Sequence, residues 1–374
     1  MQKKEAITLL GVGDIVIDQE QPETAFKYVV EVLRSGDITY ANCEQALSDK
    51  GSPNPKQCIH SDPRNIPALL SAGIDVVSLA NNHTQDWGKE ALVDTMARLK
   101  EAGLPYVGVG NNLAEARQPV ILERKGTRVG FLAYCCVGPE GLSYEAQHDI
   151  PGYAPVRSWT IYDHVDPQPG TWPRIISMPY KDELAAMVED IKKLRTQVDV
   201  VVVCPHWGLH VIPRIIPMYC FDIGHAAVDA GADLILGTHT HVLKGIEIYH
   251  DKAIFYNTGD FIFNMGRGQR SVDNKQRYVS PRHVSDLKIL YNVDPKGWEV
   301  EHKHSLIAKA VIEDGKIKRV SYIPCYLDDQ LVPTIVKRSD PRGQGVFNYV
   351  EDVSRSEGLP TRFSWDGDEV LITP

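Results

Sequence analysis

Seven polar residues, spread over well-separated segments of the chain, have side chains suited to holding metal ions. They are Asp14, Glu44, Asn82, His83, His206, His239 and His241. Carboxylates supply anionic oxygens, one of which can bridge two ions, imidazoles suit zinc, iron and similar ions, and asparagine offers an amide oxygen. Two divalent ions about 3.5–4 Å apart can lower the pKa of a water between them and stabilise a reacting oxygen. The residue types therefore predict a hydrolytic site with two divalent ions, and ligand type alone leaves manganese, iron and zinc open.

The spacing of His239 and His241 supports this hypothesis. The two histidines are separated only by Thr240. On a strand-like turn, residues two apart point to the same side, so both rings can reach neighbouring ions. A single histidine after a strand is more often a hydrogen-bonded structural residue than a ligand, and the pair is the stronger indication.

The elements that must position these residues are strands. Runs expected to form strands cover residues 7–12, 38–43, 75–80, 198–204 and 233–236, and each of the seven residues follows one of them. In open α/β sheets, ligands bind outside the carboxyl ends of the strands. We therefore expect the seven side chains to meet at one edge of a sheet.

The rest of the pattern predicts an α/β chain with a strand-rich tail. Helices are expected at residues 24–34, 65–72, 89–102, 182–195 and 221–230, a further strand at 129–134, and a hairpin over 246–256. Residues 138–180 and 264–283 show no period and read as long functional loops or insertions. Strands follow at 306–313, 315–324 and 369–372. We predict one domain over residues 1–325 with those two insertions, and an extension at 326–374 packed on the same domain.

Bulk composition limits the class of protein. The chain has 374 residues and a net charge of −9, which argues against a nucleic-acid partner. No run of about 18 apolar residues predicts a membrane-spanning helix. The seven cysteines form no C-x-x-C pair, so reduced thiols in a cytoplasmic protein are expected.

Several blocks, in this order, resemble the CapA-type family associated with poly-γ-glutamate synthesis and capsule formation. They are residues 13–14, 42–44, 72–83, 86–88, 206–208, 230–242 and 255–263. The match covers roughly residues 7–325 with gaps, and this family looks like a branch of the calcineurin-like metallophosphoesterases. The resemblance implies a four-layer α/β/β/α sandwich, in which two mixed sheets pack face to face and are flanked by helices.

The resemblance also implies roles for the candidate ligands. Asp14 and His241 would bind the first ion, and Glu44 would bridge. Asn82, His206 and His239 would bind the second ion, and His83 would be the acid/base or the oxyanion partner.

Two departures from the family pattern concern the same site. The usual Asp-x-His is Asp14-Ile15-Val16 here, so the first ion lacks one imidazole. The usual Ser-Leu-Gly-Asn is residues 257–260, Asn-Thr-Gly-Asp, which affects the substrate side of the site.

The leading hypothesis is a hydrolase that uses a metal-bound hydroxide on an amide or peptide-type substrate, by family analogy γ-glutamyl. A phosphoesterase, a metal-dependent peptide epimerase and a non-enzymatic polymer-binding protein are the alternatives. His210, Arg267 and Arg270 are candidate substrate-binding residues, because arginines bind carboxylates and phosphates with two hydrogen bonds. His302 and His304 alternate on a strand-like run, so one of them could face the site. We expect a small-molecule or peptide-like substrate and no membrane partner. The oligomeric state is left open.

Overall fold

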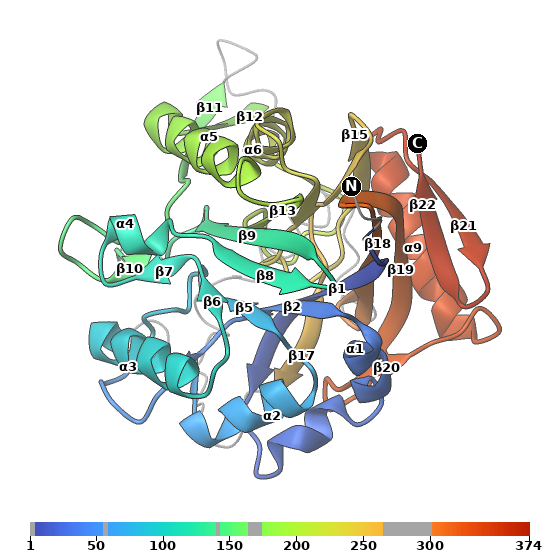
Figure 1. Cartoon of the computed structure of the whole chain (residues 1–374). Coiled ribbons are helices and arrows are strands. Elements are labelled where there is room, and N and C mark those ends of the chain that lie inside the picture. The colour runs from blue at the N-terminus through green and yellow to red at the C-terminus, as the bar shows by residue number, and fades with distance from the viewer. Residues whose placement is uncertain (1–3, 55–58, 140–142, 164–173, 265–300) are drawn as a thin grey trace, which may run out of the picture.

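Two mixed β-sheets pack face to face, and helices cover the outer face of each (Figure 1). The computed structural model describes residues 4–54, 59–139, 143–163, 174–264 and 301–374. The four-layer α/β/β/α sandwich implied by the resemblance is confirmed.

The larger sheet has ten strands within the described residues. Its main order is β21 (Arg362–Asp366), β22 (Glu369–Thr373), β19 (Lys316–Leu327), β18 (His304–Glu313), β1 (Ile7–Ile17), β2 (Ile38–Cys43), β5 (Val76–Ser78) and β6 (Tyr106–Val107). β17 (Asp260–Asn264) pairs with β1, and β20 (Pro333–Ile335) pairs with β19. The strands β1, β2, β5, β6 and β17 run parallel, and the others are antiparallel to their neighbours.

The smaller sheet has six strands in the described part of the chain. Their order is β15 (Ile246–Tyr249), β16 (Lys252–Phe255), β14 (Leu234–Leu236), β13 (Val200–His206), β9 (Thr127–Cys135) and β8 (Val120–Arg124). The four central strands are parallel and the two edge strands antiparallel. The predicted hairpin over 246–256 is confirmed, and its turn places His250 and Asp251 at positive φ.

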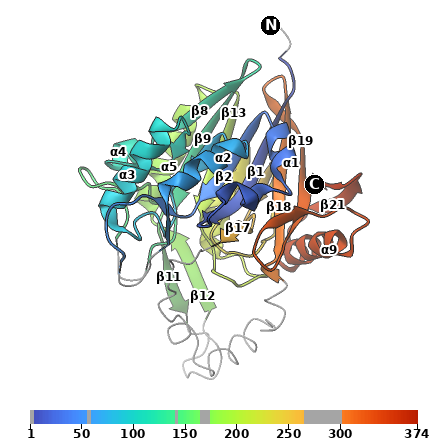
Figure 2. The same ribbon diagram turned by 90° about the horizontal axis from the view of Figure 1, so that it is seen from below.

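Short elements and helices complete the sandwich. The two-stranded pieces are β3 (Ala46–Leu47) with β4 (His60–Ser61), β7 (Val109–Gly110) with β10 (Gly152–Tyr153), and β11 (Ser158–Asp163) with β12 (Arg174–Pro179). The α-helices are α1 (Val30–Ser35), α2 (Ile66–Ser71), α3 (Gly88–Glu101), α4 (Leu113–Ala116), α5 (Lys181–Arg195), α6 (Met218–Asp229) and α9 (Pro341–Ser356). Pro22–Phe26 and Pro63–Asn65 are 3-10 helices. Figure 2 shows the β11–β12 hairpin projecting from the body of the molecule.

The main core lies between the two sheets. Tyr40 on β2 stacks on Phe131 of β9, with ring centroids 6.0 Å apart. A second apolar cluster fills the space between the smaller sheet and α5 and α6, where Ile191 and Ile223 are fully buried. Because both faces of β13 are covered, its run of four valines is buried throughout, as a continuous apolar run predicts.

Three sequence expectations need correction. β1 does not end before Asp14 but continues to Ile17, because β17 pairs with its second half. The helix expected at 24–34 is a 3-10 turn followed by α1, and the break lies at Val29, a β-branched residue with φ −126°. Residues 138–180 are not without pattern, since they contain β10, β11 and β12.

The tail beyond residue 325 continues the same layers. β21 and β22 extend the larger sheet, and α9 packs against β19 and against β15 of the smaller sheet. No helix among the described residues is long and apolar enough to cross a membrane. The six cysteines in the described part, Cys43, Cys135, Cys136, Cys204, Cys220 and Cys325, are all free and buried.

Candidate metal centre

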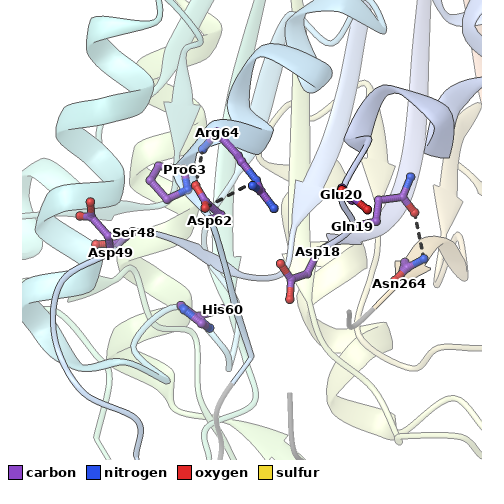
Figure 3. Close-up of a pocket in the computed structure, with 10 residues that line it drawn as sticks. All are labelled: Asp18, Gln19, Glu20, Ser48, Asp49, His60, Asp62, Pro63, Arg64 and Asn264. Carbon is purple, nitrogen blue, oxygen red and sulfur yellow. Dashed lines mark hydrogen bonds and ion pairs between the residues drawn. The ribbon is translucent and has the colours of Figure 1, made fainter. Parts of the chain in front are cut away.

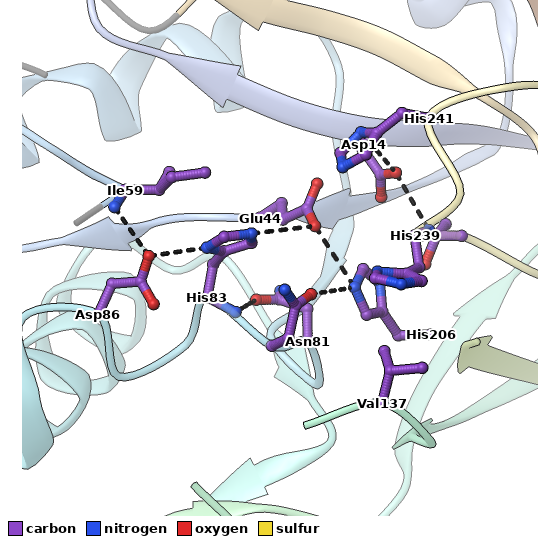
Figure 4. Close-up of polar contacts among 12 residues, drawn as sticks. Asp14, Glu44, Ile59, Asn81, His83, Asp86, Val137, His206, His239 and His241 are labelled. Carbon is purple, nitrogen blue, oxygen red and sulfur yellow. Dashed lines mark hydrogen bonds and ion pairs between the residues drawn. The ribbon is translucent and has the colours of Figure 1, made fainter. Parts of the chain in front are cut away.

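The predicted ligands meet where the carboxyl ends of parallel strands from both sheets face each other (Figure 4). From the larger sheet come Asp14 within β1, Glu44 directly after β2, and Asn82 in the loop after β5. From the smaller sheet come His206, the last residue of β13, and the histidines of the loop after β14. The structure thus brings together residues that are far apart in the sequence: Asp14 and His241 are separated by 227 positions.

The donor atoms fall into two groups, each close enough to hold one ion. One group is Glu44, His206 and His239, and the other is Asp14, His241 and Asp260. Within each group the candidate ligand atoms lie within 4.8 Å of one another. The resemblance also implied two positions, with Asp14 and His241 at one and His206 and His239 at the other. In the structure Asp260 joins the first group, and Glu44, expected to bridge, falls in the second.

Unused hydrogen-bonding capacity shows that these residues fit a cation. Both carboxylate oxygens of Glu44 and the Nδ1 of His239 are buried and accept or donate no hydrogen bond within the described residues. Leaving a buried polar atom unpaired costs about 1–3 kcal/mol, and more when it is charged. A divalent ion would satisfy these atoms.

The charge balance of the centre leads to the same conclusion. Asp14, Glu44 and Asp260 are at most 1% exposed. In the described part of the chain their ion-pair partners are all histidines, at 2.7–3.9 Å. Three buried carboxylates without a lysine or arginine partner are costly, since buried charges need a compensating charge or metal.

Raised pKa values of Asp14 and His241 partly compensate the negative charge of the buried carboxylates. Burial and the neighbouring Glu44 raise the pKa of Asp14 well above its usual value. Burial alone would lower the pKa of His241, but the carboxylates of Asp260, Glu44 and Asp14 outweigh it and raise that pKa to about 10. Burial would also raise the pKa of Glu44, yet the nearby His241 and His206 hold it at about 2.

The histidines of the other group are held neutral. Burial lowers the pKa of His206 and brings the pKa of His239 well below its usual value. A neutral imidazole is the form that binds a metal ion.

A contact between its ring and the Thr238 hydroxyl orients His206. Its Nδ1 lies 2.9 Å from the Thr238 hydroxyl, so its Nε2 points into the centre, where it lies 2.7 Å from the Asn82 Oδ1. Metal-binding histidines commonly use their second ring nitrogen in this way. Asn42, in turn, donates from its Nδ2 to the Asp14 Oδ1 at 2.7 Å.

His83 forms a dyad with Asp86 beside the centre. The His83 Nδ1 lies 2.7 Å from the Asp86 Oδ2, and its Nε2 lies 3.9 Å from the Glu44 Oε1 (Figure 4). Burial would lower the pKa of His83, but the charge and the hydrogen bond of Asp86 outweigh it and raise the pKa. Asp86 is itself fixed by the backbone N–H of Ile59 at 2.8 Å. His83 can therefore hold a proton and present it to the centre.

The backbone of the loop after β14 is strained at its two histidines. His239 has φ +100° and His241 has φ +56°, conformations rare for residues with a side chain. Such strain costs on the order of 1–3 kcal/mol at each residue and clusters at functional sites. This backbone conformation directs both rings toward the centre, where the ring centroids lie 6.3 Å apart.

The candidate substrate residues are only partly placed. His210 is exposed, and its ring lies 4.9 Å from that of His241 and 5.7 Å from that of His239, at the solvent side of the centre. Arg267 and Arg270 lie outside the described residues. His302 has its Nδ1 3.4 Å from the Asp260 Oδ2, whereas His304 packs against Tyr349.

The sequence analysis gave no ligand or supporting role to four residues of the centre. Asp260, Asp86, Asn42 and Thr238 all contact predicted ligands or His83. Three of them lie within four positions of a predicted site residue: Asp86, Asn42 and Thr238. This proximity in the sequence could have identified them as candidates. Asp260 begins a strand instead of following one, so the positional argument did not find it.

A cavity of about 880 Å³ is lined mostly by polar and charged residues (Figure 3). Its lining residues come from the segments directly after β1 and β3, from residues 60–64, and from the last residue of β17. They are Asp18, Gln19, Glu20, Ser48, Asp49, His60, Asp62, Pro63, Arg64 and Asn264. Burial raises the pKa of Asp18 there. None of the predicted metal ligands lines this cavity.

A family model described as bacterial capsule synthesis protein PGA_cap matches residues 8–265. The chain is 28% identical over 274 residues to the PGA biosynthesis protein CapA of Bacillus subtilis (strain 168), covering 68% of this chain and 63% of that protein. It is 29% identical over 278 residues to the capsule biosynthesis protein CapA of Bacillus anthracis, covering 71% and 62%. It thus spans less than two thirds of the length of these relatives.

Among solved structures, the calcineurin-like phosphoesterase YfkN of Bacillus subtilis aligns with 13% identity and a TM-score of 0.39. The alignment covers 94% of this chain and 97% of that one.

Proposed function

The chain belongs to the PGA_cap family of bacterial capsule synthesis proteins, and we propose that it is a hydrolase that uses two divalent metal ions to cleave an amide bond. The observation that carries the proposal is the pair of buried carboxylate–imidazole groups between the two sheets. The amide class, in particular a γ-glutamyl bond, is proposed because the relatives are named for PGA and capsule biosynthesis.

The proposed ligand assignment follows the two groups. Asp14 and His241 would hold one ion, and Asn82, His206 and His239 would hold the other. Glu44 serves both, since its carboxylate belongs to the second group and its charge also acts on His241 of the first. Manganese, iron and zinc all suit a mixed oxygen and nitrogen donor set, so the identity of the ions is left to the measurement below.

Two divalent ions, when bound, would supply Lewis acids and lower the pKa of a water between them. The chain itself supplies the proton that an amine leaving group needs. His83 holds this proton on the Nε2 that faces Glu44, because Asp86 raises its pKa from the other side of the ring. General acid catalysis of this kind contributes roughly 10²- to 10⁴-fold to a rate. His210, exposed beside His239 and His241, would contact the substrate.

Elemental analysis of the purified protein tests the proposal. We expect about two transition-metal ions per chain, and their loss in the double variant Asn82→Ala, His239→Ala. The matched control is Asn111→Ala, His148→Ala, which removes the same side-chain types from exposed positions outside the centre. The wild type and the control should then hydrolyse γ-glutamyl amides in preference to phosphoesters, and the first variant should not.

Three results would contradict the proposal. Preference for phosphoesters would replace the amide class. One ion per chain, together with a peptide product of unchanged mass and inverted chirality, would indicate an epimerase. No ion after reconstitution with manganese, iron and zinc would leave a polymer-binding protein as the better hypothesis.

A further inference from the structure

Asp260 stands directly opposite Asp14 on the neighbouring strand. In the parallel pair β1–β17, Asp14 and Asp260 are Cα partners, so their side chains project from the same face of the sheet. Two glycines allow the strands to approach closely at this point. A Cβ on Gly13 would lie 1.8 Å from the carbonyl oxygen of Gly259, and the Asp14 N–H donates to that oxygen at 3.1 Å.

The carboxylates of these two residues converge on one nitrogen of His241. The His241 Nδ1 lies 2.7 Å from the Asp260 Oδ1 and 3.9 Å from the Asp14 Oδ2. A carboxylate that only orients a metal-binding histidine holds the ring nitrogen opposite to the metal. Here the same nitrogen faces both aspartates, so the three donor atoms surround one point.

We propose that Asp260 is a direct ligand of the ion held by Asp14 and His241. The inference rests on the proposed function, because it assigns a further ligand to one of its two ions. It also accounts for both departures from the family pattern. Val16 is buried where the usual imidazole would stand, and Asp260 carries a carboxylate where the usual residue is asparagine.

Neighbouring residues hold Asp260 in place, as expected for a metal ligand. Its second oxygen, Oδ2, lies 3.4 Å from the Nδ1 of His302, and the Ser305 hydroxyl donates to its backbone carbonyl. Ligating carboxylates are usually fixed by such outer contacts.

The two positions then differ in chemistry. The first has the carboxylates of Asp14, Asp260 and Glu44 with one imidazole, and the second has two imidazoles, an amide and Glu44. Carboxylate oxygens suit manganese, whereas imidazoles suit zinc and iron. The first position should therefore prefer a hard divalent ion such as Mn²⁺.

Mn²⁺ titration of the metal-free full chain, followed by electron paramagnetic resonance and elemental analysis, tests this assignment. Asp260→Asn keeps the shape and removes the charge. We expect it to retain one ion and to lose more than about 100-fold in Mn²⁺ affinity at the other position, beyond the 10- to 100-fold typical of an outer contact. The matched control is Asp94→Asn, a buried aspartate paired with Lys50 and Arg98 away from the centre, which should bind two ions.

A second variant reports direct ligation without relying on affinity. In Asp260→Cys loaded with Co²⁺, a thiolate bound to the ion gives a near-ultraviolet charge-transfer band, which the wild type and Asp94→Asn should lack. The assignment would be overturned if Asp260→Asn bound both ions with unchanged affinity, or if Asp260→Cys bound cobalt without the band. In that case Asp260 is only the ion-pair partner of His241, and the proposed hydrolase stands. A wild type that binds no ion would overturn both proposals.

Discussion

Removal of the two proposed metal ions should lower the melting temperature by an amount that follows from the number of sites and the length of the chain. An ion present at 100 times its dissociation constant stabilises the folded state by about 2.7 kcal/mol per site. Two sites therefore contribute about 5.4 kcal/mol. Unfolding entropy is about 2.1 cal/mol/K per residue, or roughly 0.8 kcal/mol/K for 374 residues. The expected drop on chelation is about 7 °C.

The variant Glu44→Gln tests whether this stabilisation comes from the centre. Glu44 serves both groups and its two oxygens are buried without a hydrogen bond in the described structure, so the variant should lose most of the 7 °C shift. Glu247→Gln is the matched control. Glu247 is also buried and contacts a histidine, His225, at 2.9 Å, but it lies outside the centre and should keep the full shift.

Differential scanning calorimetry at neutral pH, with excess Mn²⁺ and with chelator, measures the shift in all three proteins. A wild-type difference below about 1 °C would refute the reasoning, because it would mean that the buried carboxylates are stable without a bound ion. Equal shifts in the wild type and in Glu44→Gln would place the ions elsewhere in the molecule.

Three further predictions concern residues around the centre. Asp86→Asn should lower kcat for amide hydrolysis about ten-fold or more, because His83 loses the carboxylate that raises its pKa. The alkaline limb of the pH–rate profile should therefore move to lower pH, while the metal content stays unchanged. Gly13→Ala should lower the free energy of unfolding in urea by about 1–3 kcal/mol or more, since its Cβ would collide with the Gly259 carbonyl. A loss under about 1 kcal/mol would contradict the close approach of β1 and β17. Burial lowers the pKa of Lys244 from 10.5 to about 7, so between pH 7 and 10 the unfolded chain binds a proton that the folded chain does not. Wild-type stability should therefore rise with pH across this window relative to Lys244→Met, and parallel curves would contradict the shift.

The sequence predicted which side chains meet at the centre best where a strand and the candidate ligand are adjacent in the chain. His206, His239 and His241 lie at or just beyond the carboxyl ends of parallel strands, and this position follows from hydrophobic runs that end in polar residues. Asp260 could not be found in this way. Its place in the centre depends on the pairing of β17 with β1, and pairing between strands far apart in the chain leaves no local trace.

Other elements were missed because their local signals conflict. α9 contains Gly343 and Gly345, which weaken a helical pattern, although Asp340 caps its first turn and Val346, Val350 and Val353 form its buried stripe. The β11–β12 hairpin was not predicted, because the adjacent apolar residues Ile175 and Ile176 interrupt the alternation of polar and apolar residues in β12.

The arrangement of the metal centre also fixes when, during synthesis, it can be completed. Its side chains run from Asp14 to Asp260. The larger sheet contributes the first of them, the smaller sheet then contributes the three histidines, and Asp260 comes from the larger sheet again. A growing polypeptide that has left the ribosome only as far as β13 would present Asp14, Glu44 and Asn82 without the histidines of the loop after β14. Each ion position takes residues from both sheets, so neither sheet alone offers a complete one. Filling both proposed positions would therefore be a late event. It would need the histidines of the loop after β14 and, at the first position, Asp260 of β17, and it would report that the two sheets have packed.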